Sequence, residues 1–214
     1  MFVKDLMSWP VITIFDTSTV GEALELLRAK KIRHLPVVGT NQILVGVVSE
    51  TDLIKVFPNG RELSTFESNL LARTPVSKVM KKALYIAPDK TVEEAALVMR
   101  TNRISCLPVL DENGKLIGLI SKNDIIDAFI TSLGLKEGGT RISLVYQRKW
   151  GFLSELVTFA DKRNIRIDNI VSFDKELVLK ISGKAMEFIN DLRKAGYNIT
   201  DVSYIEPDRL EKAE

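Results

Sequence analysis

Two pairs of polar side chains are the strongest candidates for chemistry: Ser49 with Asp52, and Ser121 with Asp124. A hydroxyl and a carboxylate at a helix start can hold a sugar phosphate. The carboxylate accepts hydrogen bonds from ribose hydroxyls, while the serine and the helix amides receive phosphate oxygen. The same residue types also cap helices by accepting backbone amides. For one copy the cap is the simpler interpretation, and the repetition at one spacing shifts the balance towards a binding site.

The two pairs belong to an internal repeat. In the first copy, Leu-Pro-Val precedes a turn and Gly46, and in the second the same pattern leads to Gly118. Each landmark of the second copy lies 72 positions after its counterpart, as Pro36 and Pro108 do. A fixed offset through strand, turn and helix start indicates one structural unit that is duplicated. Each glycine permits close approach of another group to the backbone.

Each repeat predicts a strand, a helix, two strands and a second helix. The first strand is expected at residues 11–14, and capping boxes at Thr19 and Thr91 start the first helices. Residues 35–38 with 43–48, and 107–110 with 116–120, predict antiparallel hairpins. Both hairpins lead to helices that begin near the two aspartates. The helical stripes expected in the core are Val20, Ala23, Leu24 and Leu27, then Val92, Ala95, Ala96 and Met99.

The remaining chain changes character. A break at Pro58-Asn59-Gly60 and a helix capped by Ser64 separate the repeats, and a Gly-rich stretch ends the second. Beyond it, the pattern predicts the order βαββαβ with antiparallel pairing. One helix there is expected to bury Leu153, Leu156, Val157 and Ala160. The predicted parts are 1–57 and 76–133 (repeats), 58–75 and 134–139 (linkers), 140–205 (second domain) and 206–214 (flexible tail).

Composition excludes several function classes. The 214 residues include 45% hydrophobic and 27% charged residues, which fits a folded globular protein rather than a disordered chain. The order of the predicted strands and helices gives the mixed α/β (α+β) class. A net charge of +2 gives no pull towards nucleic acid or membrane. The single cysteine, Cys106, excludes an internal disulfide, and the single histidine, His34, has no partners for a triad or a zinc site. With no signal peptide or membrane-length segment, we expect a cytoplasmic protein. With no cluster of Cys or His residues, we expect no catalytic cofactor or metal.

The repeated motif resembles a tandem pair of CBS domains over residues 1 to about 133. The resemblance implies a disc with pseudo-twofold symmetry and two clefts that hold AMP, ADP, ATP or S-adenosylmethionine. It also implies that Asp52 and Asp124 bind ribose, with Ser49 and Ser121 assisting at ribose or phosphate. The base would be read by backbone near Ile12, Thr13, Leu84 and Tyr85, packed against Pro36 and Pro108.

The copies differ just before the Leu-Pro pair. The first has Arg33 and His34, where the second has Ser105 and Cys106. The resemblance implies that basic residues here touch phosphate, so we expect unequal sites, the one using Arg33 preferring a more phosphorylated ligand. An exposed charge at a helix end is an equal alternative for Arg33.

The C-terminal part, roughly residues 140 to 205, resembles an ACT domain in its element order and in Lys149-Trp150-Gly151-Phe152-Leu153. The resemblance implies dimerisation through its sheet, or a small ligand whose carboxylate approaches Gly151. Trp150 and Phe152 could equally be interface, core or ligand-contact residues. A CBS pair followed by an ACT-like unit is similar to the acetoin-utilisation accessory protein family.

These features predict a regulatory protein rather than an enzyme. It would bind an adenine nucleotide or S-adenosylmethionine as a regulatory ligand, form a homodimer, and report to an enzyme or transporter. The alternative is a non-catalytic assembly module whose clefts are vestigial.

Overall fold

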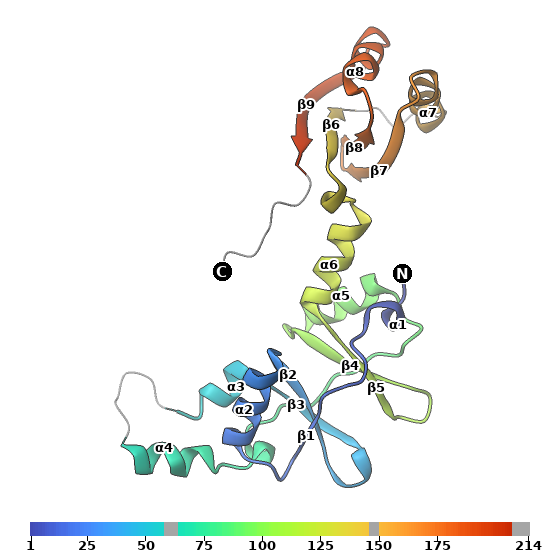
Figure 1. The fold of residues 1–214 in the computed structure, drawn as a ribbon. Helices are drawn as coiled ribbons and strands as arrows, with labels where there is room; N and C mark the ends of the chain where they lie inside the picture. The colour runs from blue at the N-terminus through green and yellow to red at the C-terminus, as the bar shows by residue number, and fades with distance from the viewer. Residues whose placement is uncertain (58–63, 146–149, 207–214) are drawn as a thin grey trace. The chain divides into compact units, whose positions relative to one another are not determined.

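The computed structural model describes residues 1–57, 64–145 and 150–206. The chain forms two compact units, Met1–Ile125 and Ile126–Glu214 (Figure 1). The division falls inside helix α6 (Lys122–Ser132), and the predicted domain boundary at 134–139 stays a prediction. The mixed α/β class is confirmed. The predicted break at Pro58-Asn59-Gly60, the position of Lys149 and the tail from Pro207 lie outside the described residues.

The first unit contains both repeats. The elements of the first repeat are α1 (Val3–Leu6), β1 (Ile14–Phe15), α2 (Val20–Lys30), β2 (His34–Val38), η1 (Thr40–Gln42), β3 (Leu44–Ser49) and α3 (Glu50–Ile54). Helix α4 (Thr65–Ala72) and the 3-10 turn η2 (Val76–Lys78) follow. The second repeat has α5 (Val92–Thr101), β4 (Cys106–Leu110), β5 (Leu116–Ser121) and α6. The strands β2 and β3, and likewise β4 and β5, are antiparallel hairpins, as predicted.

The local predictions for the repeats hold except for the first strand of each repeat, and in the second repeat that strand is reduced to a single bridge between Ile86 and Val109. The capping boxes at Thr19, Ser64 and Thr91 form, and the predicted helical stripes pack into two clusters, one for each repeat. The strand predicted at 11–14 is wrong in extent, because only Ile14 and Phe15 pair with β2.

Each repeat is completed by a short segment from the other. We name residues 7–12 the first lead segment and residues 80–84 the second lead segment. Ser8 and Leu119 exchange backbone hydrogen bonds of 2.8 and 3.3 Å, and Lys81 and Val47 exchange two of 2.9 Å. The two lead segments therefore cross, each reaching the β-hairpin of the opposite repeat.

The glycines of the repeated motif allow this crossing. A Cβ on Gly46 would lie 2.8 Å from the Met80 sulfur and 2.9 Å from the Lys81 carbonyl oxygen. A Cβ on Gly118 would collide with the side chain of Met7. The predicted close approach is confirmed, and the group that approaches is a segment of the protein itself.

The second unit has the order βαββαβ that the sequence predicts. Its elements are η3 (Leu135–Glu137), β6 (Gly139–Val145), α7 (Phe152–Lys162), β7 (Arg166–Phe173), β8 (Glu176–Ser182), α8 (Ala185–Lys194) and β9 (Asn198–Ile205). The strands form one antiparallel sheet in the order β7-β8-β6-β9, the ferredoxin-like arrangement. Both helices contribute to a single core against this sheet.

The buried face of α7 differs from the prediction. Leu156 and Ala160 are buried as expected, but Leu153 and Val157 are 54% and 55% exposed. The core face follows Phe152, Leu156 and Ala160 at four-residue spacing. Successive helical residues are about 100° apart, so the residue after each core position turns away from the sheet.

The crossing of the lead segments generates a stability prediction. Gly118→Ala should lower the free energy of unfolding by about 1–3 kcal/mol, because the added methyl group overpacks against Met7. Urea denaturation midpoints measure the change. Gly21→Ala is the matched control, because Gly21 lies inside helix α2 and its added Cβ would be 3.4 Å from Ala72 of α4, an ordinary contact distance. This substitution should raise the free energy of unfolding by roughly 0.5–1 kcal/mol. Equal changes in the urea midpoint of the two variants would contradict the close approach at Gly118.

Candidate functional site

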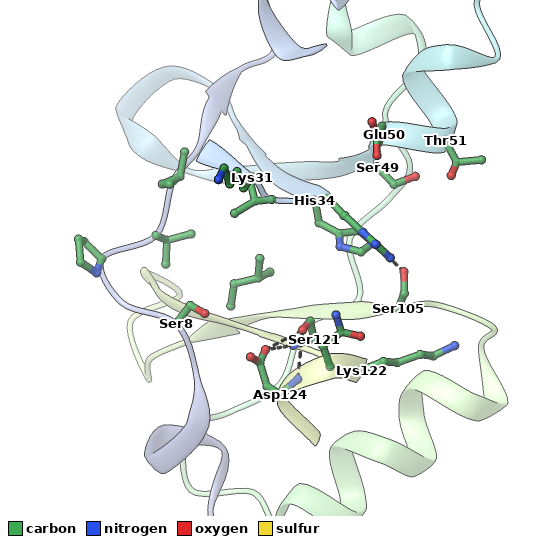
Figure 2. A pocket seen from close by; sticks show the side chains of 17 residues that line it. Ser8, Lys31, His34, Ser49, Glu50, Thr51, Ser105, Ser121, Lys122 and Asp124 are labelled. Carbon is green, nitrogen blue, oxygen red and sulfur yellow. Dashed lines mark hydrogen bonds between the residues drawn. The ribbon is translucent and has the colours of Figure 1, made fainter. Parts of the chain in front are cut away.

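A cavity of about 740 Å³ lies between the two repeats of the first unit (Figure 2). This volume is within the range of small-molecule sites, roughly 300–1,000 Å³. The residues that line it are Ser8, Pro10, Val11, Ile12, Lys31, Ile32, Arg33, His34, Ser49, Glu50, Thr51, Ser105, Leu119, Ser121, Lys122, Asn123 and Asp124. The first lead segment and both hairpins therefore contribute to one site, which we call the Asp124 cleft.

Ser121 and Asp124 form a capping box at the start of α6. The Ser121 amide and hydroxyl donate to Oδ2 of Asp124 at 2.6 and 2.7 Å, and the Asp124 amide donates to the Ser121 hydroxyl at 3.4 Å. Among the described residues, nothing is bonded to the other carboxylate oxygen, Oδ1. The cap interpretation is correct, and it leaves one oxygen of Asp124 available to a ligand.

Ser49 and Asp52 form the same capping box in the first repeat, with a different partner on the second oxygen. The Ser49 hydroxyl donates to Oδ2 of Asp52 at 2.6 Å, while the Lys81 ammonium lies 2.5 Å from Oδ1. Burial pushes the pKa of Asp52 upwards, but the hydrogen bonds from Lys81 and Ser49 outweigh it and hold the pKa below its ordinary value. Asp52 is thus an ionised carboxylate whose oxygens are both bonded.

The structure brings six of the predicted site residues to the Asp124 cleft and places the others elsewhere. Ile12, Arg33, His34, Ser49, Ser121 and Asp124 line the cavity. Asp52, Thr13, Pro36, Pro108, Leu84 and Tyr85 are not among its lining residues. The two prolines are buried in β2 and β4, and Leu84 and Tyr85 are exposed. Gly151 lies in the second unit, where it precedes α7 with a left-handed φ of 78°.

Eleven of the 17 lining residues were not predicted as site residues, and three of these, Lys31, Lys122 and Ser8, add charged or polar side chains. Lys31 ends α2 in the left-handed region, with a φ of 53°, and Lys122 is the first residue of α6. Ser8 belongs to the first lead segment. Lys31 and Lys122 join Arg33 as cationic groups at the cleft, whose lining also includes the acidic groups Glu50 and Asp124. Lys122 directly follows Ser121 in the sequence, and this was the one signal that could have indicated a cationic residue at the cleft.

A hydrogen bond between His34 and Ser105 joins the repeats across the cleft. His34 Nε2 lies 2.7 Å from Ser105 Oγ, as the dashed line in Figure 2 shows. Burial lowers the pKa of His34, opposed by the charge of Asp52 and supported by Arg33. The imidazole is therefore neutral near pH 7 and acts as a polar bridge between the repeats.

The neighbouring Cys106 is not a nucleophile. It is buried, and its burial raises the pKa of the thiol to about 12, with the charge of Asp52 adding to the effect. A thiol that stays protonated at neutral pH has little thiolate to react. Within residues 1–57, 64–145 and 150–206, no cluster of His, Cys, Asp and Glu could hold a metal ion. None of the helices in the same ranges is long and apolar enough to span a membrane.

Comparison with known proteins identifies the repeats. The CBS domain family matches residues 3–59 and 76–131, more than half of the chain. An uncharacterized protein of Methanocaldococcus jannaschii is 30% identical over 61% of this chain and 92% of its own length. The homoserine O-acetyltransferase of Methanococcus vannielii is 34% identical over 58% of this chain, which spans only 24% of that enzyme.

Solved structures agree over the same part of the chain. A protein named for acetoin utilization (AcuB), from Vibrio cholerae, is 33% identical, with a TM-score of 0.53 over 64% of this chain and 96% of its own. CBSX2, solved with AMP, is 32% identical, with a TM-score of 0.51 over 61% and 96%. The CBS pair of protein MJ0100, solved with 5′-methylthioadenosine and S-adenosylmethionine, is 26% identical, with a TM-score of 0.51 over 60% and 95%.

The environment of His34 generates a pH prediction. The folded state lowers the pKa of His34 below its ordinary value of 6.5, so the unfolded chain binds the proton more readily. Stability contributed at this site should therefore be lost as the pH falls below that value. We expect the urea midpoint of the wild type to fall more than that of His34→Gln between about pH 8 and about pH 5.5. Parallel pH profiles for the two proteins would contradict this assignment.

Proposed function

The chain belongs to the CBS domain family, and from this premise we propose that it is a regulatory protein that senses an adenosine compound in the Asp124 cleft. The candidates are AMP, ADP, ATP and S-adenosylmethionine. Two CBS proteins with similar folds were solved with AMP or with S-adenosylmethionine and 5′-methylthioadenosine. The observation that carries the proposal is the unbonded Oδ1 of Asp124, an acceptor in a cavity of about 740 Å³.

The chemistry of the cleft suits each part of such a ligand. A ribose diol can donate to Oδ1 of Asp124 while Oδ2 stays bonded to Ser121. Val11, Ile12 and Leu119 offer apolar surface for the base. Lys31, Arg33 and Lys122 offer cationic donors for phosphate, and charge-assisted hydrogen bonds of this kind are the stronger ones.

The match to homoserine O-acetyltransferases supports regulation rather than catalysis by this chain. The match covers 24% of the enzyme from Methanococcus vannielii. CBS domains are generally regulatory, so we propose that the shared part is a sensor attached to a separate catalytic region in those enzymes.

An assembly role is the second candidate function. Phe66 and Leu70 lie four residues apart on α4, and both are exposed. An apolar pair on one helix face suits contact with another protein, such as a second copy or a regulated enzyme. The second unit would then act as an ACT-like dimerisation domain, or bind a small ligand near Gly151. Light scattering at micromolar concentration should show a dimer, and a monomer would contradict the homodimer.

A thermal-shift titration tests the sensor. A ligand that binds the folded state at ~100 times its dissociation constant should stabilise the protein by ~2.7 kcal/mol. We expect a shift with at least one of AMP, ADP, ATP and S-adenosylmethionine, and its loss in Asp124→Ala. Asp127→Ala removes an exposed acid one turn further along α6 and should keep the shift. A shift that survives in Asp124→Ala would contradict the site, and no shift with any ligand would favour the assembly role.

The cationic side of the cleft predicts phosphate selectivity. Arg33→Gln should lower the affinity for ATP about tenfold (~1.4 kcal/mol) more than that for adenosine, because adenosine has no phosphate to contact. Isothermal titration calorimetry measures both. Arg28→Gln removes an equal charge from α2 outside the cavity and should leave the ratio unchanged. Equal losses for the two ligands in Arg33→Gln would indicate a general effect on the cleft.

A further inference from the structure

One structural difference between the two halves of the first unit is not visible from the constant offset of 72 residues. Val47 in β3 and Leu119 in β5 are counterparts, 72 positions apart. Val47 is bonded to Lys81, and Leu119 is bonded to Ser8. Lys81 and Ser8 are therefore structural counterparts, although the sequence offset pairs Lys81 with Trp9. The second lead segment is one residue shorter than the first, and the register shifts accordingly.

The difference between Ser8 and Lys81 at this position decides whether Oδ1 of the repeated aspartate has a bonding partner. In the Asp124 cleft, Ser8 lines the cavity, and Oδ1 of Asp124 has no partner among the described residues. In the other half, the Lys81 ammonium lies 2.5 Å from Oδ1 of Asp52. The same oxygen of the same capping box is thus open in one half and occupied in the other.

An ammonium on Asp52 opposes binding of a ribose there. The Asp52 side chain is only 11% exposed, and the Lys81 side chain that pairs with it is 69% exposed. A ribose hydroxyl would have to displace the ammonium and exchange an ion pair for a hydrogen bond from an uncharged donor. Displaced Lys81 would also leave a carboxylate without its counter-ion.

We propose that Lys81 is an internal plug that keeps the cleft at Asp52 closed to adenosine compounds, so that each chain binds one ligand, at Asp124. The plug is tethered by the two backbone hydrogen bonds between Lys81 and Val47, and Gly46 makes room for that contact. The proposal rests on the proposed function, since it concerns which of two pseudo-equivalent clefts the ligand can enter.

Stoichiometry tests the plug. Isothermal titration calorimetry of the full chain, with AMP and separately with S-adenosylmethionine, should give one site per chain for the wild type. Lys81→Ser, which copies Ser8 into the second lead segment, should raise this number to two. The double variant Lys81→Ser with Asp52→Ala should return it to one. The reciprocal change, Ser8→Lys, should place an ammonium at Asp124 and remove binding by the wild-type site.

Lys82→Ser is the matched control, because it removes the same charge from the next residue, which is exposed and makes no ion pair with Asp52. It should bind one ligand, as the wild type does. Melting temperatures confirm that each variant is folded.

The outcomes separate this inference from the proposed function. Two sites in the wild type, or one site in Lys81→Ser, would overturn the plug while adenosine binding stands. A fall from two sites to one on Lys81→Ser would show that Lys81 is a ligand contact, which also overturns it. No binding of either ligand to the wild type or to Lys81→Ser would remove the proposed function and the plug together.

Discussion

The structure of the first unit depends on one constraint: each repeat is finished by a segment from the other. Ser8 pairs with β5 and Lys81 with β3 through reciprocal backbone hydrogen bonds. The contact is possible because Gly46 and Gly118 carry no Cβ. Neither repeat can complete its β-hairpin edge alone, so the pair forms one unit with the cleft between its halves. At one crossing, the Lys81 ammonium reaches the carboxylate of Asp52 in the opposite repeat.

The sequence predicted the features that depend on neighbours along the chain. The capping boxes at Thr19, Ser64 and Thr91 involve residues three positions apart, and the Asp111–Gly114 turn is closed by its own residues. The hairpins follow from the same local patterns, and the exact repeat identified both capping-box pairs. Features that depend on register between distant segments were missed. The lead segments differ in length by one residue, so a constant offset could not show that Lys81 meets Asp52.

The second unit illustrates the same limit. Its element order was readable from periodicity, but the buried face of α7 was misjudged by one residue at Leu153 and Val157. A bulge between Ile167 and Asn169 in β7 places Asp168 against Ser182 and the buried Lys180. No local pattern predicts a bulge, which re-aims one side chain and changes the partners of its strand. Gly134 and Gly139 lie against the Lys180 side chain, so part of the predicted linker packs on this sheet.

A helix cap and a ligand site, the two interpretations that the sequence left open, are compatible at one aspartate. A carboxylate has two, and in each repeat Oδ2 serves the capping box with its serine. The cap fixes the carboxylate before any ligand arrives, so binding at Oδ1 would cost no loss of helix stability and little reordering of the side chain. The cap would thus support the proposed site and is not an alternative to it. What distinguishes the two halves is the partner of the remaining oxygen, and that partner is set by which residue the opposite lead segment brings to the crossing.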